Sequence, residues 1–110
     1  MDKANVRVTD FQERVYAAVS EIPKGRVSTY KSIAAKLKCG SSRAVGQALR
    51  RNPYAPKVPC HRVIASDLTI GGFCGARVGK EIAKKRDLLE REGVEFVRGK
   101  LADRDRLYFG

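Results

Sequence analysis

Apolar residues in the first half of the chain recur every three or four positions, which is the spacing of one helix face. The pattern predicts three helices: Phe11 to about Ile22, a second that ends near Leu37, and Ser42 to about Arg51. Each follows a side chain that can accept a hydrogen bond from the first turn: Thr9 or Asp10, Ser28 or Thr29, and Ser41.

The second half of the chain carries shorter patterns. His61 to Ala65 predicts a strand, and residues 68–70 predict its partner in a small hairpin. Residues 71–75 are rich in glycine and predict a loop that a ligand can approach closely. A last helix is predicted from about Val78 to Arg91, followed by a tail with an edge strand. This helix carries Lys80, Lys84, Lys85 and Arg86, and most of these four are expected on a solvated face.

The second and third helices are short, and a turn with Gly40 joins them, which is typical of a helix-turn-helix. The expected fold is therefore mainly α, a winged helix-turn-helix-like domain with a small β-hairpin. The chain of 110 residues is expected to form one domain, with residues 1–8 as a flexible arm and no N-terminal domain before it.

The charge of the chain narrows the class of partner. Lys and Arg number 23 against 12 Asp and Glu, a net charge of +11, which favours nucleic acid over an acidic protein or a membrane surface. No apolar run is long enough to span a bilayer, and no signal peptide opens the chain. Three scattered cysteines predict a reducing, intracellular location, and a single histidine argues against a metal site.

The run Pro59-Cys60-His61-Arg62-Val63 is the strongest chemical signal. A thiol beside an imidazole and an arginine is expected to form a thiolate near neutral pH, because a base or a positive charge lowers the thiol pKa. The alternative is a small buried cysteine with no reaction to perform, since adjacent side chains need not face each other.

With this run, the chain resembles the C-terminal domain of the O6-alkylguanine-DNA alkyltransferases, which carry a Pro-Cys-His-Arg-Val motif. The resemblance extends over residues 9–95, in the family's order. It includes residues 27–30, the recognition-helix segment 41–49, the exit turn 51–53 and the late-helix segment 88–93.

The resemblance implies repair of DNA by direct damage reversal. An alkyl group on guanine O6 of double-stranded DNA would move irreversibly to the cysteine, so the protein is a stoichiometric methyltransferase that needs no cofactor and no metal. A monomer without membrane contact is expected, located with the DNA in the cytoplasm, nucleoid or nucleus.

The resemblance also implies the catalytic roles. Cys60 would be the nucleophile, His61 would take its proton through a water, and Glu92 would orient the imidazole, following triad logic. Tyr30 would press on the neighbouring phosphate and help the leaving guanine accept a proton. Asn52 would tie the recognition helix to the active-site turn. The alternatives are a half-buried core tyrosine for Tyr30 and a solvated residue for Glu92.

The DNA contacts follow from the same resemblance. The target base must leave the stack, and Arg43 would fill the gap that it leaves. The recognition helix would enter the minor groove, for which Ala44, Gly46 and Ala48 are small enough. The alternatives are a surface arginine at position 43 and close helix packing at Gly46. The remaining predicted DNA contacts are Gln47, Arg50, Arg51 and Arg62.

The predicted substrate loop, Phe73, Cys74 and Gly75, departs from the family's Tyr-Ser pair. Phe73 keeps the apolar wall without a hydroxyl, and Cys74 can still offer its backbone N–H to guanine O6. Residues 77–85 lengthen this region relative to shorter members of the family.

Two other functions compete with transfer. Alkyltransferase-like proteins share the short architecture, bind alkylated DNA and recruit nucleotide excision repair without transfer. They carry tryptophan or alanine at the acceptor position, so Cys60 favours the transferase. A plain helix-turn-helix transcription factor would need neither the Pro-Cys-His-Arg run nor the glycine-rich loop.

Overall fold

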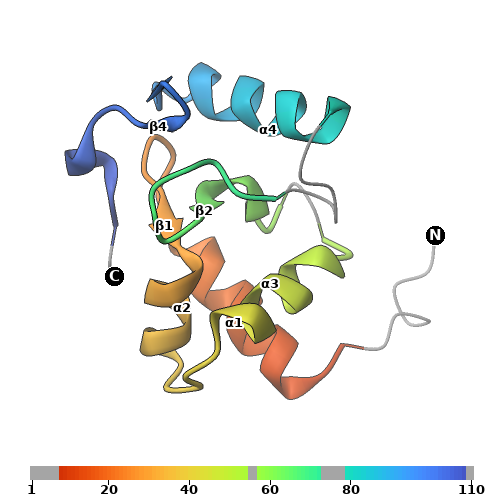
Figure 1. The fold of residues 1–110 in the computed structure, drawn as a ribbon. Helices are drawn as coiled ribbons and strands as arrows, with labels where there is room; N and C mark the ends of the chain where they lie inside the picture. The colour runs from red at the N-terminus through yellow and green to blue at the C-terminus, as the bar shows by residue number, and fades with distance from the viewer. Residues whose placement is uncertain (1–7, 55–56, 73–78, 109–110) are drawn as a thin grey trace.

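The computed structural model describes residues 8–54, 57–72 and 79–108. In Figure 1, three helices pack together at one end, α4 crosses the other end, and the short strands β1 and β2 lie between them. None of the helices in the described ranges is long and apolar enough to cross a membrane. The elements are α1 (Asp10–Ser20), β1 (Ser28–Thr29), α2 (Tyr30–Lys36), α3 (Ser42–Arg50), β2 (Val63–Ile64), α4 (Lys80–Arg91), β3 (Phe96–Val97) and β4 (Lys100–Leu101).

The predicted caps of the first three helices are confirmed. Thr9 forms a reciprocal capping box with Gln12 at the start of α1. The Thr29 hydroxyl accepts the Ser32 N–H at 3.0 Å, and the Ser41 hydroxyl accepts the Ala44 N–H at 3.1 Å. Each bond satisfies an N–H that has no partner inside its own helix, so the local sequence determines where these helices begin.

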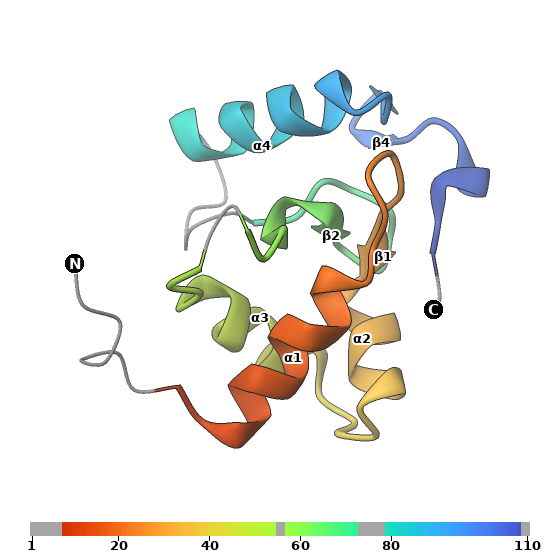
Figure 2. The ribbon, with the colours of Figure 1, turned by 180° about the vertical axis from the view of Figure 1, so that it is seen from behind.

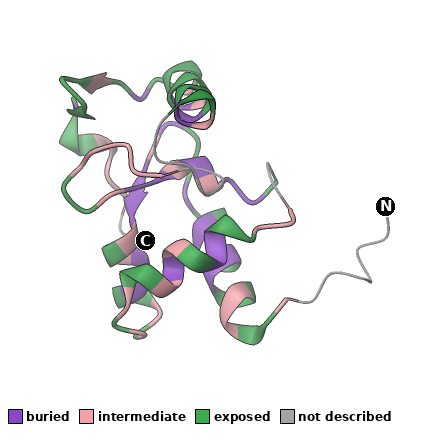
Figure 3. Ribbon diagram, turned by 45° about the vertical axis from the view of Figure 1, so that its right-hand side comes forward, coloured by how far each residue is buried: buried purple, intermediate pink, exposed green. Residues whose placement is uncertain are grey.

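Strand β2 separates two apolar cores. Its two residues point to opposite sides, as successive residues of a strand do. Val63 joins the cluster formed by α1, α2 and α3, and Ile64 joins a second cluster with Leu89 of α4 and Val94. Figure 3 shows the buried positions along the inner faces of these elements. Apolar packing therefore holds strand β2 from both sides.

The fold class is confirmed, but the predicted hairpin is in the wrong place. The β2 strand pairs with β1 in parallel, Ser28 opposite Val63, and both β2 residues are fully buried. Residues 66 and 67 form the turn after β2, the Ala65 N–H donates to the Thr69 carbonyl at 3.0 Å, and Thr69 forms its β-bridge with Lys100. The observed hairpin is β3–β4 in the tail. A buried strand has no alternating pattern, so its partner cannot be identified from spacing alone.

The helix-turn-helix is formed by α2 and α3, with Gly40 in the turn at a φ of 68°, where a side chain would be strained. Figure 2 shows α3 beside the segment that leads to β2, and α1 crossing in front of the pair. This packing places the exit of α3 next to the Cys60 segment.

Candidate active site and nucleic-acid interface

Cys60 opens a single 3-10 turn, Cys60–Arg62, directly after Pro59. Its backbone N–H donates to the Val58 carbonyl at 2.8 Å. The Asn52 side chain, at the exit of α3, donates to the same Val58 carbonyl at 3.1 Å and accepts the Tyr54 N–H at 2.9 Å. These are the hydrogen bonds expected of Asn52 between the recognition helix and the active-site turn. Asn52 therefore fixes the half-buried Cys60 relative to α3.

The surroundings of Cys60 do not favour a free thiolate. Burial raises the pKa of the Cys60 thiol, and a hydrogen bond from Asn52 and the charge of Lys85 oppose that rise without cancelling it. This direction runs against a thiolate near neutral pH, because desolvation of the anion outweighs the nearby positive charge. The thiolate expected from the sequence stays a prediction.

His61, the residue after Cys60, forms a hydrogen-bonded pair with Glu92. The His61 ring is buried, and its Nε2 lies 3.0 Å from Glu92 Oε2. Burial lowers the pKa of His61 although Glu92 raises it, so the imidazole is neutral at pH 7 and can accept a proton. Burial opposes ionisation of Glu92, yet hydrogen bonds from Arg62 and His61 lower the pKa of Glu92 to about 2. Glu92 is thus a permanent anion beside a neutral imidazole.

The Arg62 side chain is half-buried, and its guanidinium contacts Glu92 of this pair. Its Nε and Nη2 donate to the two oxygens of Glu92 at 2.9 and 2.8 Å, and its Nη1 donates to the Ile22 carbonyl at 3.0 Å. A bidentate arginine fixes the plane of a carboxylate, which in turn orients the His61 ring. The geometry favours this supporting role, and a DNA contact by Arg62 stays a prediction.

The Glu92 carboxylate is expected to make the fold acid-sensitive. Because folding lowers its pKa from 4.5 to about 2, ionised Glu92 stabilises the folded state above pH 4.5, and this contribution is lost as the pH falls through about 2. The lowered pKa of His61 has a separate effect. Below about pH 6.5 the histidine takes up a proton more readily in the unfolded chain than in the folded one, so the folded state loses stability.

Urea unfolding of wild type and Glu92→Gln between pH 7 and pH 2 measures the Glu92 contribution. Wild type should be the more stable protein at pH 7, and the difference should shrink below pH 4.5. Glu90→Gln, an exposed neighbour on α4, is the matched control and should follow wild type. A difference that stays constant down to pH 2 would contradict the ion pairing described here.

Tyr30 lies at the first position of α2, with its hydroxyl donating to the Gly72 carbonyl at 3.3 Å. Burial, and then the nearby Cys60, raise the pKa of Tyr30 to about 12, so the hydroxyl keeps its proton at neutral pH. The side chain also packs against the first core, as the alternative of a half-buried core tyrosine supposed. Both properties suit a proton donor held at a fixed position near Cys60.

The outer face of α3 is open. Arg43, Gln47, Arg50 and Arg51 are exposed, and Ala44 and Gly46 are partly so. A Cβ built on Gly46 meets no atom within 4 Å, which rules out close helix packing as the reason for this glycine. Ala48 is 3% exposed and lies in the first core, so the prediction that it faces DNA is wrong. Its place three residues after Val45 puts it on the inner stripe of the helix.

The structure also reveals a residue that the sequence pattern missed. Lys85, expected on the solvated face of α4, is fully buried. It stands three residues after Ile82 and four before Leu89, so the apolar stripe of this helix runs through it. The position of Lys85 between two apolar residues of this stripe was the feature of the sequence that could have indicated its burial. The predicted substrate loop, Phe73, Cys74 and Gly75, lies outside the described residues.

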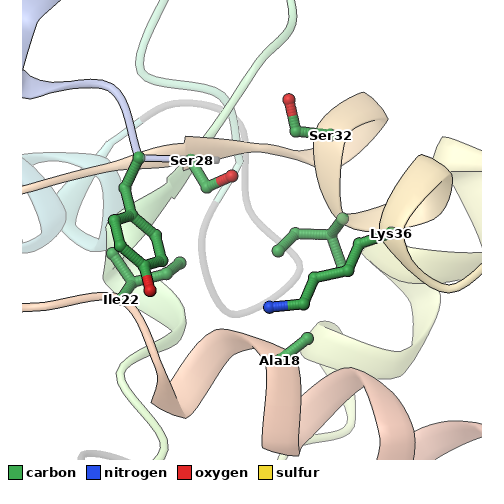
Figure 4. A pocket seen from close by; sticks show the side chains of 7 residues that line it. Ala18, Ile22, Ser28, Ser32 and Lys36 are labelled. Atoms are coloured by element: carbon green, nitrogen blue, oxygen red, sulfur yellow. The ribbon is translucent and has the colours of Figure 1, made fainter. Parts of the chain in front are cut away.

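A separate small hollow opens between α1, β1 and α2 (Figure 4). Figure 4 shows the Lys36 side chain crossing it toward Ala18, and an ion pair joins Lys36 to Glu21 of the α1 cap. None of the residues around the hollow is a predicted site residue: they are Ala18, Ile22, Ser28, Ser32, Ile33, Lys36 and Tyr108.

Residues 10–94 match the sequence model of the 6-O-methylguanine DNA methyltransferase family, DNA binding domain. The chain belongs to this family. It is 45% identical over 86 residues to a methylated-DNA–protein-cysteine methyltransferase of Methanothermobacter thermautotrophicus, covering 78% of this chain and 46% of that protein. The homologue from Sulfolobus acidocaldarius is 46% identical over 95 residues, covering 84% and 57%. The chain thus spans about half the length of the curated relatives it matches.

Solved structures of the 6-O-methylguanine DNA methyltransferase family superpose well on the chain. Mycobacterium tuberculosis OGT in complex with DNA gives a TM-score of 0.69 at 45% identity, covering 78% of this chain and 51% of that chain. S. pombe Atl1, in complex with damaged DNA containing O6-carboxymethylguanine, gives 0.79 at 36% identity, covering 94% and 98%. The first shares more sequence with this chain, and the second gives the higher TM-score.

Proposed function

We propose that this protein repairs alkylated DNA by moving the alkyl group from guanine O6 in double-stranded DNA to Cys60. The observation that carries the proposal is the arrangement around Cys60. The next residue in the chain is His61, whose neutral ring is hydrogen-bonded to Glu92, and the protonated hydroxyl of Tyr30 lies near Cys60. The methyltransferase names of the relatives support the same reaction. An intracellular, DNA-associated location is part of the proposal.

The proposed step is a displacement at carbon. The Cys60 proton passes to His61, and the sulfur forms a bond to the alkyl carbon as the bond from that carbon to O6 breaks. The electron pair of the broken bond stays on guanine, which becomes a good leaving group when it accepts the Tyr30 proton. The Tyr30 phenolate then takes a proton from water and the imidazolium gives one to water, so the net change is that guanine gains the proton that the thiol loses. The permanent charge on Glu92 stabilises the imidazolium that forms. The product is a thioether, so each protein molecule reacts once.

DNA would bind along the outer face of α3. The net charge of +11 favours a polyanion, and the open surface at Gly46 leaves room for a close approach of the duplex. Because a base inside the stack cannot reach Cys60, the alkylated guanine must rotate out of the duplex. We assign the filling of the gap to Arg43, which is exposed at the start of α3.

The decisive experiment is mass spectrometry after incubation with a duplex oligonucleotide that contains one O6-methylguanine. We expect the intact mass to rise by that of one CH2 group, because CH3 replaces the thiol proton, and peptide fragmentation to locate the change on Cys60. The same duplex with plain guanine is the control. Methylation at Cys39, or no mass change under conditions where the duplex binds, would overturn the proposal.

A second function is favoured by one observation. S. pombe Atl1, in complex with damaged DNA, superposes on the chain with a TM-score of 0.79, against 0.69 for Mycobacterium tuberculosis OGT. The alternative is therefore a lesion-binding protein without transfer, which recruits excision repair. Binding to the O6-methylguanine duplex with no mass gain would support it. Equal binding with and without the lesion would indicate a plain helix-turn-helix protein.

The open surface at Gly46 gives a further prediction. Gly46→Ala should raise the stability of the fold by about 1 kcal/mol, because alanine is the better helix former and meets no clash. Gly46→Leu should fold equally well and weaken duplex binding by about tenfold or more, since the minor groove is only about 6 Å wide. Thermal unfolding and fluorescence anisotropy measure the two effects. Duplex affinity unchanged in Gly46→Leu would exclude a close approach at this position.

A further inference from the structure

Lys85 is the largest fully buried side chain among the described residues. Its Nζ donates to three backbone carbonyls: Val63 at 2.7 Å, Ile70 at 2.6 Å and Gly72 at 2.8 Å. An ammonium group has three protons to donate, and each of these oxygens lies within hydrogen-bond distance. A buried charge is unfavourable unless it is well hydrogen-bonded, and these three carbonyls meet that need. A lysine at such a position is expected to have a structural or functional role.

The three carbonyls belong to two segments that flank the reactive cysteine. Val63 is in β2, immediately after the 3-10 turn of Cys60. Ile70 and Gly72 belong to the segment that follows β2 and contacts Tyr30. One side chain of α4 thus joins the cysteine's own strand to the 70–72 segment. The hydrogen bonds fix the distance between the two.

The 70–72 segment in turn holds Tyr30. The Gly72 carbonyl accepts both the Lys85 ammonium and the Tyr30 hydroxyl. Gly71, at a φ of 74°, packs so closely that a Cβ there would lie 3.3 Å from Tyr30 Cε2 and 3.2 Å from the Ala65 nitrogen. The Lys85 Nζ is itself 5.9 Å from the centre of the Tyr30 ring. The ring is therefore enclosed by Lys85, Gly71 and Gly72.

We propose that Lys85 is a positioning residue for the transfer step: it anchors the Ile70–Gly72 segment to β2 and, through the Gly72 carbonyl, fixes the Tyr30 hydroxyl near Cys60. The inference rests on the proposed function, because Tyr30 matters only if guanine leaves from the site. Lys85 acts on the rate of the bound complex and not on affinity, since it lies beneath the surface and α3 carries the DNA contacts.

The test compares Lys85→Met with Lys84→Met, its exposed neighbour on α4. Methionine keeps the length and removes the charge and the donors. Transfer rates at saturating O6-methylguanine duplex and the duplex dissociation constant are measured separately. For Lys85→Met we expect the saturated rate to fall by about tenfold to a hundredfold, the size of effect that a small misplacement produces, with affinity within about twofold. Lys84→Met should match wild type in both.

A double-mutant cycle with Tyr30→Phe separates positioning from a general loss of structure. If Lys85 acts through the Tyr30 hydroxyl, removing both groups slows transfer little more than Tyr30→Phe alone. Losses that multiply would overturn the inference, because Lys85 would then act independently of Tyr30. A Lys85→Met protein that folds and transfers at the wild-type rate would overturn it as well.

Gly71→Ala keeps the inference testable if Lys85→Met does not fold. The added methyl pushes the 70–72 segment away from Tyr30 while the lysine stays in place. The saturated rate should fall with affinity retained, and an unchanged rate would overturn the inference. Wild type is measured in parallel: if it takes up no methyl, the proposed function fails, and with it this role of Lys85. If it transfers and the variants do too, only the role of Lys85 fails.

Discussion

Cys60→Ala is expected to take up no methyl while it still binds the O6-methylguanine duplex with wild-type affinity. The thiol makes the new bond, whereas α3 and the charge of the domain hold the DNA, so the substitution removes one function and leaves the other. Alanine is also tolerated at this half-buried position, because it introduces neither a polar group nor extra volume.

Cys39→Ser is the matched control for this prediction. Cys39 is the other described cysteine, lies in the turn between α2 and α3, and contacts the Ser41 carbonyl through its sulfur at 3.6 Å. Serine can keep that contact, so transfer should be unchanged. Intact-mass measurement and anisotropy are made on both variants. Methyl uptake by Cys60→Ala, or its loss in Cys39→Ser, would show that the acceptor has been assigned to the wrong residue.

The sequence predicted the helices of this domain well because their boundaries depend on local contacts. Thr9, Thr29 and Ser41 each bond to an N–H within their own first turn, and such bonds can be recognised in any sequence. The Pro-Cys-His-Arg-Val run and its resemblance to a known family similarly led to Cys60, His61 and Glu92. The structure places His61 and Glu92 in contact although 31 residues separate them.

The errors concern contacts between distant segments. A parallel β1–β2 pair joins residues far apart in the chain, and no short pattern identifies such a partner. Lys85 was expected on a solvated face because of its charge, but it is fully buried and backbone carbonyls accept its hydrogen bonds. Arg62 is half-buried and pairs with Glu92, and its contact with DNA stays a prediction. Charge alone does not indicate burial when the compensating group comes from another element.

The thiol itself illustrates the same point. From the sequence, the neighbours of Cys60 are an imidazole and a guanidinium, which lower a thiol pKa. In the structure, Arg62 turns to Glu92, His61 is neutral, and burial raises the pKa of Cys60. The residues adjacent in the chain are therefore not the charges that the sulfur experiences. In the proposed transfer reaction, the proton of Cys60 therefore has to be taken by a base.

Arg43→Ala is expected to slow repair of duplex DNA by about tenfold or more and to leave the reaction with free O6-benzylguanine nearly unchanged, because only the duplex must be unstacked. The structure motivates this by position. Arg43 is exposed at the start of α3, on the same open face as Gly46, where the helix can approach the duplex closely. A side chain there can occupy the space that the extruded base leaves, which lowers the free energy of the flipped state.

Arg50→Ala is the matched control, since Arg50 is exposed on the same helix at its far end. It removes the same charge, so it should weaken duplex affinity while the rate at saturating duplex stays near that of wild type. Rates are measured for wild type and both variants with duplex, single-stranded and free-base substrates. An intercalating Arg43 predicts a loss that is large in duplex, small in single strands and absent with the free base. If Arg43→Ala loses the same rate on all three substrates, Arg43 supports the pocket or the fold. If Arg50→Ala slows the duplex reaction as much as Arg43→Ala does, Arg43 contributes only its charge.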